Sequence, residues 1–220
     1  MTPAGIKTAM VRVPAGSFEM GSNDDEGEQP VHVVTADSFL MDVTEATVRD
    51  YEACVRKGMC SPAESGQYCN SGKIDRRDHP INCVDWHQAT AFCAWLGKRL
   101  PTDEEWEYAA RGTDGRTYPW GMESPDKQLC WKAVGTCRVG QFPSGRSPFG
   151  VLDLAGNVDE WTSDGHSKDY LEPRAKDRRI VRGTAYHTRD PHYVRATYRG
   201  EAADTHSLSY LGFRCVRSVL

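Results

Sequence analysis

Helical spacing of apolar side chains is confined to the first half of the chain. Val48, Tyr51 and Val55 fall on one helical face. This spacing predicts a helix that opens at Thr44 and ends at Gly58.

Two further helices are predicted from capping signals. Asp85 is followed three residues later by Gln88, which is a capping-box pattern, and Gly97 ends the apolar stripe behind it. Residues 102–105, TDEE, form a second capping box, and the short helix that they open ends at Gly112.

Strands are predicted outside these helices. Residues 9–21 predict a hairpin, and residues 31–41 predict a pair of strands. The acidic stretch 22–30 predicts a solvated loop. From residue 113 to 220 the chain is dense in Gly, Pro and aromatic residues and shows no helical period, so short strands and long loops are expected.

The length of the chain favours one domain over residues 1–220. Its charge and its short apolar runs argue against a nucleic-acid partner and a membrane span. The net charge of −4 argues against a nucleic-acid-binding surface. No apolar run approaches the roughly 18 residues that a membrane span requires. The first residues, MTPAGIKTAM, lack the pattern of a signal peptide.

Eight cysteines are scattered through the predicted helices and loops. Zinc sites usually need two cysteines separated by two to four residues, and no such pair occurs, so disulfides are predicted. Disulfides imply an oxidising, extracytoplasmic compartment. The alternative is a cytosolic protein with buried free thiols. The cysteines are Cys54, Cys60, Cys69, Cys83, Cys93, Cys130, Cys137 and Cys215.

Six stretches in order resemble the formylglycine-generating enzyme, or sulfatase-modifying factor, family. That resemblance implies an α+β variant of the C-type-lectin fold, with little regular structure and a pocket built from loops. The stretches are VRVPAGSFEMGS (11–22), SFLMDVTEATVRDYEAC (38–54), PINCVDWHQATAFCAWLGKRLPTDEEWEYAARG (80–112), YPWG (118–121), FGVLDLAGNVDEWTSD (149–164) and RG…RATYR…LGFRC (182–215).

The resemblance also assigns some of the cysteines. It implies a disulfide between Cys93, which precedes GKRLPT, and Cys215 in GFRC. Cys130 and Cys137 are close enough in sequence to close a local loop. The cysteines at positions 54, 60, 69 and 83 allow three pairings, among which the sequence does not choose.

The run VLDLAGNVDEW resembles the calcium-binding loop of the family. By position, the resemblance implies carboxylate ligands from Asp153 and Glu160 and carbonyl ligands from Gly156 and Val158. Calcium takes several oxygen ligands from a loop that can wrap around it. The alternative is that the two carboxylates only cap turns. No second calcium ion is expected, because LCWKAVGTCRVG lacks the Asn and Asp of the family's other site.

The resemblance also implies that the copper site of the family is lost. Active members bind Cu(I) through two cysteines, and His187 and His192 align with these positions. Thr184 stands at a serine position, and Asp159 stands where a pocket tryptophan is usual. Thiolates suit Cu(I) because it is a soft ion. Copper-dependent formylglycine formation is therefore not expected.

One hypothesis for this pocket is a rebuilt metal site. His187 and His192, with Asp159 or Asp190, would suit Fe(II), Cu(II) or Zn(II). This predicts a metal-dependent oxidoreductase or a hydrolase. The alternative is that the histidines are ordinary residues of an exposed loop.

A second hypothesis is a binding or accessory module for a protein, peptide or small molecule. Segment 184–210 is rich in Tyr, His, Asp, Ser and Thr, which give contact area and adaptable hydrogen bonds. The segment also resembles the variable part of lectin-fold receptors that are diversified by retroelements. An enzyme with other chemistry stays open as well. The candidate ligand-binding residues are Thr184, Tyr186, His187, Asp190, His192, Tyr193 and Asp159.

Four arginines are predicted to hold strands and loops together. Arg182, Arg195, Arg199 and Arg214 are expected to stack on aromatic rings and to donate to backbone carbonyls.

Overall fold

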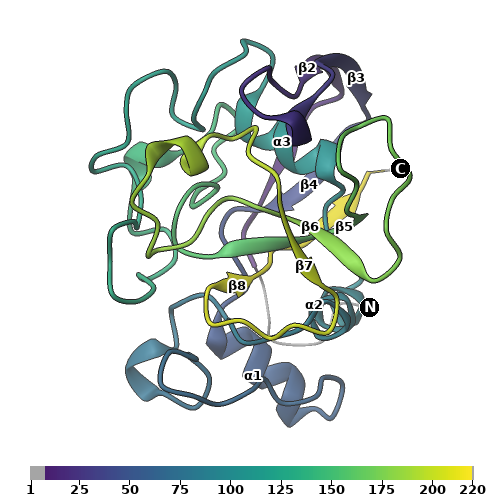
Figure 1. Cartoon of the computed structure of the whole chain (residues 1–220). Helices are drawn as coiled ribbons and strands as arrows, with labels where there is room; N and C mark the ends of the chain where they lie inside the picture. Colours follow the sequence, from purple (N-terminus) through teal and green to yellow (C-terminus); the bar gives the residue numbers. More distant parts are fainter. Residues whose placement is uncertain (1–7, 220) are drawn as a thin grey trace.

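The computed structural model describes residues 8–219, and a four-stranded sheet lies at its centre (Figure 1). The strand order is β7-β6-β5-β8, with β5 and β8 parallel and the other neighbours antiparallel. The opening decapeptide, which lacks a signal-peptide pattern, lies largely outside the described residues. The strands are β5 (Asp159–Gly165), β6 (Arg178–Arg182), β7 (Gly200–Ala203) and β8 (Leu211–Gly212).

Two helices lie on one side of this sheet, α1 (Val48–Arg56) and α2 (Trp86–Trp95) (Figure 1). Their apolar faces pack with Trp161 of β5 in one hydrophobic core. The aromatic rings of Tyr51 and Phe92 stack with centroids 5.6 Å apart. The apolar stripes predicted for these helices therefore face the sheet.

The other side of the sheet is covered by α3 (Asp103–Arg111) and a hairpin of β2 (Gly16–Met20) and β3 (His32–Ala36) (Figure 1). Trp106 and Tyr108 of α3 pack with the hairpin in a second core. A third sheet joins the two ends of the described chain, because β4 (Phe39–Asp42) pairs with both β1 (Met10–Val13) and β9 (Val216–Ser218). The 3-10 helices span Glu26–Glu28, Ile74–Arg76, Pro143–Gly145 and Pro191–Val194.

The predicted strands exist, but the predicted pairing was wrong. Residues 9–21 do not form a hairpin, because β1 pairs with β4 while β2 pairs with β3. For the same reason the two strands within residues 31–41 are not partners. Alternation identifies a strand, whereas its partner is set by the sheet that buries its apolar face.

The capping signals located two of the three helices. Both predicted capping boxes are present, at Asp85 with Gln88 and at Thr102 with Glu105. The first helix begins one turn later than predicted. Thr47 is its N-cap and accepts a hydrogen bond from the backbone N–H of Asp50, so the predicted start at Thr44 was wrong.

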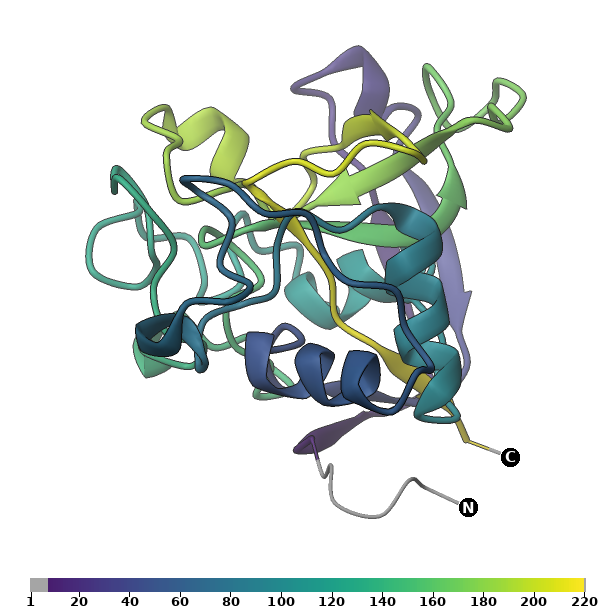
Figure 2. The same ribbon diagram turned by 90° about the horizontal axis from the view of Figure 1, so that it is seen from below.

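All eight cysteines form disulfides, as predicted. The pairing of Cys93 with Cys215 and the local pairing of Cys130 with Cys137 are confirmed. The open choice among the other four resolves to Cys54 with Cys60 and Cys69 with Cys83. Figure 2 shows α1 and α2 side by side, next to the irregular segment that these two bridges fix. In residues 8–219 no helix combines the length and apolar character of a membrane span.

The sheet face toward α3 is polar and buried. The guanidinium of Arg214 donates to both carboxylate oxygens of Glu160, at 2.6 and 2.7 Å. Arg182 forms ion pairs with Asp103 at 2.5 Å and with Glu107 at 2.7 Å. The predicted contacts with a ring and with carbonyls occur for Arg182, but carboxylates are its main partners. The Arg182 pairs hold β6 against α3, and the Arg214 pair joins β5 to the segment before β9.

Candidate ligand-binding pocket

Three chain segments meet at one edge of the central sheet. Asp159 begins β5, and its backbone N–H donates to the carbonyl of Tyr210, which directly precedes β8. β6 runs antiparallel to β5, so it ends at the same edge, at Arg182. The loop after β6 therefore begins beside Asp159 and Tyr210.

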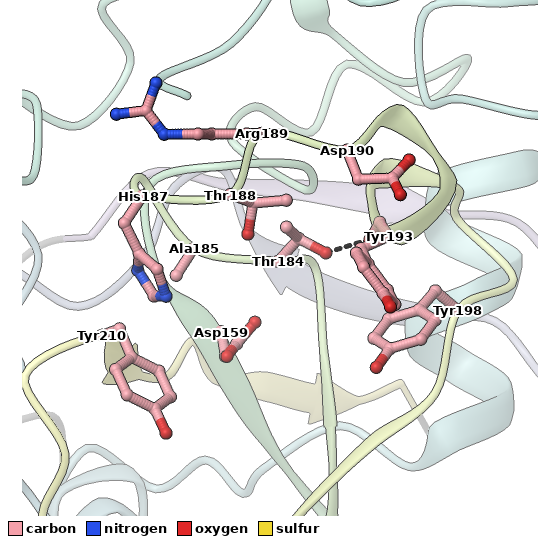
Figure 3. A pocket seen from close by; sticks show the side chains of 10 residues that line it. All are labelled: Asp159, Thr184, Ala185, His187, Thr188, Arg189, Asp190, Tyr193, Tyr198 and Tyr210. Carbon is pink, nitrogen blue, oxygen red and sulfur yellow. Dashed lines mark hydrogen bonds between the residues drawn. The ribbon is translucent and has the colours of Figure 1, made fainter. Parts of the chain in front are cut away.

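A pocket of about 520 Å³ opens at this edge (Figure 3). Nine of its ten lining residues belong to segment 184–210, and Asp159 is the tenth. Pockets of this size hold a small molecule or a side chain of a partner. The lining residues are Asp159, Thr184, Ala185, His187, Thr188, Arg189, Asp190, Tyr193, Tyr198 and Tyr210.

Asp159 lies at the floor of the pocket. Burial and the neighbouring Glu160 carboxylate raise the pKa of Asp159 to about 7, against a backbone N–H of Thr184 that donates to it. Figure 3 shows the Asp159 carboxylate between Tyr210 with His187 on one side and Tyr193 with Tyr198 on the other. The pocket thus combines one carboxylate with aromatic walls.

The predicted ligand-binding residues divide into three groups. Thr184, His187, Asp190, Tyr193 and Asp159 line this pocket. The other two, Tyr186 and His192, do not: the first is buried beside the pocket, and the second lines a neighbouring hollow.

Sequence reasoning missed five of the lining residues. Tyr198 and Tyr210 are the most informative of them, because their rings form part of the walls. Both lie in the Tyr-rich segment 184–210, so its composition was the signal that could have found them. The others are Ala185, Thr188 and Arg189.

The neighbouring hollow is built on the acidic stretch 22–30, which was wrongly predicted to be solvated throughout. Glu28 is buried, and both of its carboxylate oxygens accept hydrogen bonds from Arg195 at 2.8 Å. His192 forms a hydrogen-bonded pair with Asp25 at 2.8 Å. Tyr193 lines both hollows, so they are adjacent.

The structure does not gather the predicted transition-metal ligands in one place. His187 and Asp159 line the pocket, whereas His192 faces Asp25 in the neighbouring hollow. Among residues 8–219, no three His, Cys, Asp or Glu side chains form a group that could hold a metal ion. The rebuilt metal site stays a prediction, without support from this arrangement.

The predicted calcium loop contributes Asp153, one of two buried carboxyl groups that lie close together. Asp153 accepts a hydrogen bond from the backbone N–H of Gly140 at 2.5 Å. Beside it, Glu45 accepts from the Asn157 side chain, while its second oxygen is buried with no hydrogen-bond partner in the described part of the chain. Burial, and then the nearby Asp153 carboxylate, raise the pKa of Glu45. A cation would relieve this crowding of acidic groups.

The other predicted calcium ligands are placed differently. Glu160 already pairs with Arg214 and accepts from the indole of Trp106 at 2.9 Å. The carbonyls of Gly156 and Val158 stay predicted ligands. Asp153 and Glu45 therefore fit a hard cation, whereas Glu160 has less capacity left for one.

Comparison with known proteins decides the family. A family model described as the sulfatase-modifying factor enzyme 1-like domain matches residues 2–219. The chain belongs to this family. It is 32% identical to the inactive C-alpha-formylglycine-generating enzyme 2 of Bos taurus, over 96% of the chain and 88% of that protein. It is also 31% identical to the formylglycine-generating enzyme of Mus musculus, over 94% of the chain and 74% of that protein.

Solved structures confirm the fold. PvdO from Pseudomonas aeruginosa superimposes with a TM-score of 0.81 at 27% identity, over 96% of the chain and 94% of PvdO. Treponema denticola variable protein 1 superimposes with a TM-score of 0.78 at 21% identity, over 99% of the chain and 97% of that protein. The second likeness concerns the fold alone, so a retroelement-diversified receptor stays a prediction.

Proposed function

We propose that this chain is a binding or accessory module that captures a ligand in the loop-built pocket and does not form formylglycine. The single observation that carries the proposal is the chemistry of the pocket walls. They present a carboxylate, an imidazole and phenol rings, while every cysteine of the chain is held in a disulfide. A soft Cu(I) ion has no thiolate to bind there.

Ligand capture is expected to depend on the pocket rings. In a fragment screen followed by NMR, Tyr198→Ala should weaken the binding of most hits by at least about tenfold, since stacked aromatic contacts are lost. Trp120→Ala is the control, because Trp120 lines a separate hollow with Arg116 and Arg146. The proposal would be contradicted if Trp120→Ala weakened the binding of the hits and Tyr198→Ala did not.

A structural calcium ion at Asp153 is also proposed, with Glu45 as an additional ligand. The orphaned carboxylate oxygen of Glu45 supports a cation at this place. The ion would neutralise these two buried acids. The ion would stabilise the loop that contains Asp153, and we assign no catalytic role to it.

Calcium is expected to raise the midpoint of thermal unfolding by roughly 5–10 °C at a concentration about a hundredfold above its Kd. The comparison is between buffer with calcium and buffer with a chelator, and Glu45→Gln should reduce the response. Equal midpoints in the two buffers would mean that Glu45 and Asp153 share a proton instead of binding an ion.

An extracytoplasmic location is proposed from the disulfides. Four bridges that use all eight cysteines persist in an oxidising compartment and are rare in the cytosol.

A further inference from the structure

The floor of the pocket is a carboxylate without a cationic partner. In residues 8–219, no Lys, Arg or His nitrogen lies within ion-pairing distance of Asp159, and the charged side chain that most affects it is the acidic Glu160. Glu160 itself is paired with Arg214. The buried carboxylates of Asp103, Glu107 and Glu28 are neutralised by arginine, whereas the half-buried Asp159 is not.

The other charged side chains at the pocket do not neutralise the Asp159 carboxyl group. Arg189 and Asp190 both lie at the exposed rim and carry opposite charges. Figure 3 shows the Arg189 side chain extending away from Asp159. The charge at the floor is therefore set by Asp159.

Two aromatic pairs flank the carboxylate. The rings of Tyr193 and Tyr198 meet edge to face with centroids 5.0 Å apart, and those of His187 and Tyr210 meet at 5.2 Å. Aromatic ring faces attract cations, and phenol oxygens accept hydrogen bonds. Burial, and then the charge of Asp159, raise the pKa of Tyr198 and of Tyr210, so both phenols stay neutral.

We propose that the pocket selects ligands that carry a protonated primary amine, with the ammonium on Asp159 and its alkyl chain between the two aromatic pairs. The backbone N–H of Thr184 acts on the Asp159 carboxyl group, so a compact ammonium, which needs one oxygen, fits better than a guanidinium fork, which uses both. The amine is either a lysine side chain of a peptide or a free alkylamine. This inference rests on the proposed binding function of the same pocket.

The test compares two probes that differ only in the terminal group. In Nα-acetyl-lysine amide the terminal side-chain carbon carries an ammonium group, which Nα-acetyl-norleucine amide lacks. NMR titration of the protein above pH 7, where Asp159 is mostly ionised, should give binding of the lysine probe about tenfold tighter than that of the norleucine probe. n-Butylamine is the third probe. If it binds as tightly as the lysine probe, the ligand class is a free amine. If it binds more weakly, the ligand class is a peptide with a lysine side chain.

Asp159→Asn should abolish the preference for the lysine probe while leaving norleucine binding in place. Asn has nearly the same size as Asp and keeps one acceptor oxygen, so this variant removes the charge with little other change. Asp37→Asn is the matched control, because this exposed residue between β3 and β4 also loses a charge but does not line the pocket. The preference should survive in that variant.

The two proposals fail in different ways. Equal binding of both probes to the unmodified protein, or a preference that persists in Asp159→Asn, would overturn the amine inference and leave the pocket a binding site. If neither probe perturbs the pocket resonances, and the fragment screen finds no hit there, the binding function itself is wrong.

Discussion

Replacing Cys93 and Cys215 together with alanine is expected to lower the free energy of unfolding by about 5 kcal/mol. The two residues are 122 positions apart, and a bridge stabilises chiefly by restricting the unfolded chain, more so for a longer loop. Both cysteines are fully buried between α2 and the β9 end of the chain. Denaturant unfolding in oxidising buffer measures the loss.

The matched control removes a short bridge from the same core. Cys54 and Cys60 are six positions apart, and the same relation gives a loss of about 2 kcal/mol. If both double variants lost the same amount, loop length would not be the source of the stabilisation. If the long bridge cost less than the short one, the expected order would be reversed.

Arg214→Met is expected to destabilise the protein by about 3–5 kcal/mol in calcium-free buffer. Both Arg214 and its partner Glu160 are fully buried, and removal of the guanidinium leaves a carboxylate whose one remaining side-chain donor within residues 8–219 is the indole N–H of Trp106. Adding Glu160→Gln should restore part of the loss, because the second change removes the unpaired charge. Failure of this rescue would show that packing, and not charge, dominates.

An exposed ion pair of the same geometry provides the control. Arg178 donates to both oxygens of Glu201 at 2.6 and 2.7 Å, as Arg214 does to Glu160, but in solvent. Surface pairs contribute little, so Arg178→Met should leave the unfolding midpoint nearly unchanged. A large loss there would contradict the role given to burial.

Local signals in the sequence predicted the helices better than the sheets. The capping boxes at Asp85 and Thr102 depend on residues three positions apart, so the sequence contains all of the interaction. The pairing of β1 with β4 and of β4 with β9 depends on contacts between residues that are distant in the sequence. Composition and alternation carry no information on such partners, and this is why a hairpin was predicted wrongly.

The candidate site was predicted in part for a similar reason. Asp159 and His187 were found because the family resemblance places them at pocket positions. His192 was placed with them, but the 3-10 helix Pro191–Val194 turns it toward Asp25. Tyr210 lies far along the chain from His187, and only the start of β8 beside β5 brings the two rings together.

Incubation with copper(I), oxygen and a cysteine-containing peptide tests most directly whether this pocket performs the reaction of active relatives. Mass spectrometry of the peptide, with the Mus musculus formylglycine-generating enzyme as the positive control, gives the readout. Because all eight cysteines are held in disulfides, the peptide cysteine should remain unchanged. Conversion of that cysteine to an aldehyde by the purified chain, lost in His187→Ala, would contradict a binding role without formylglycine chemistry.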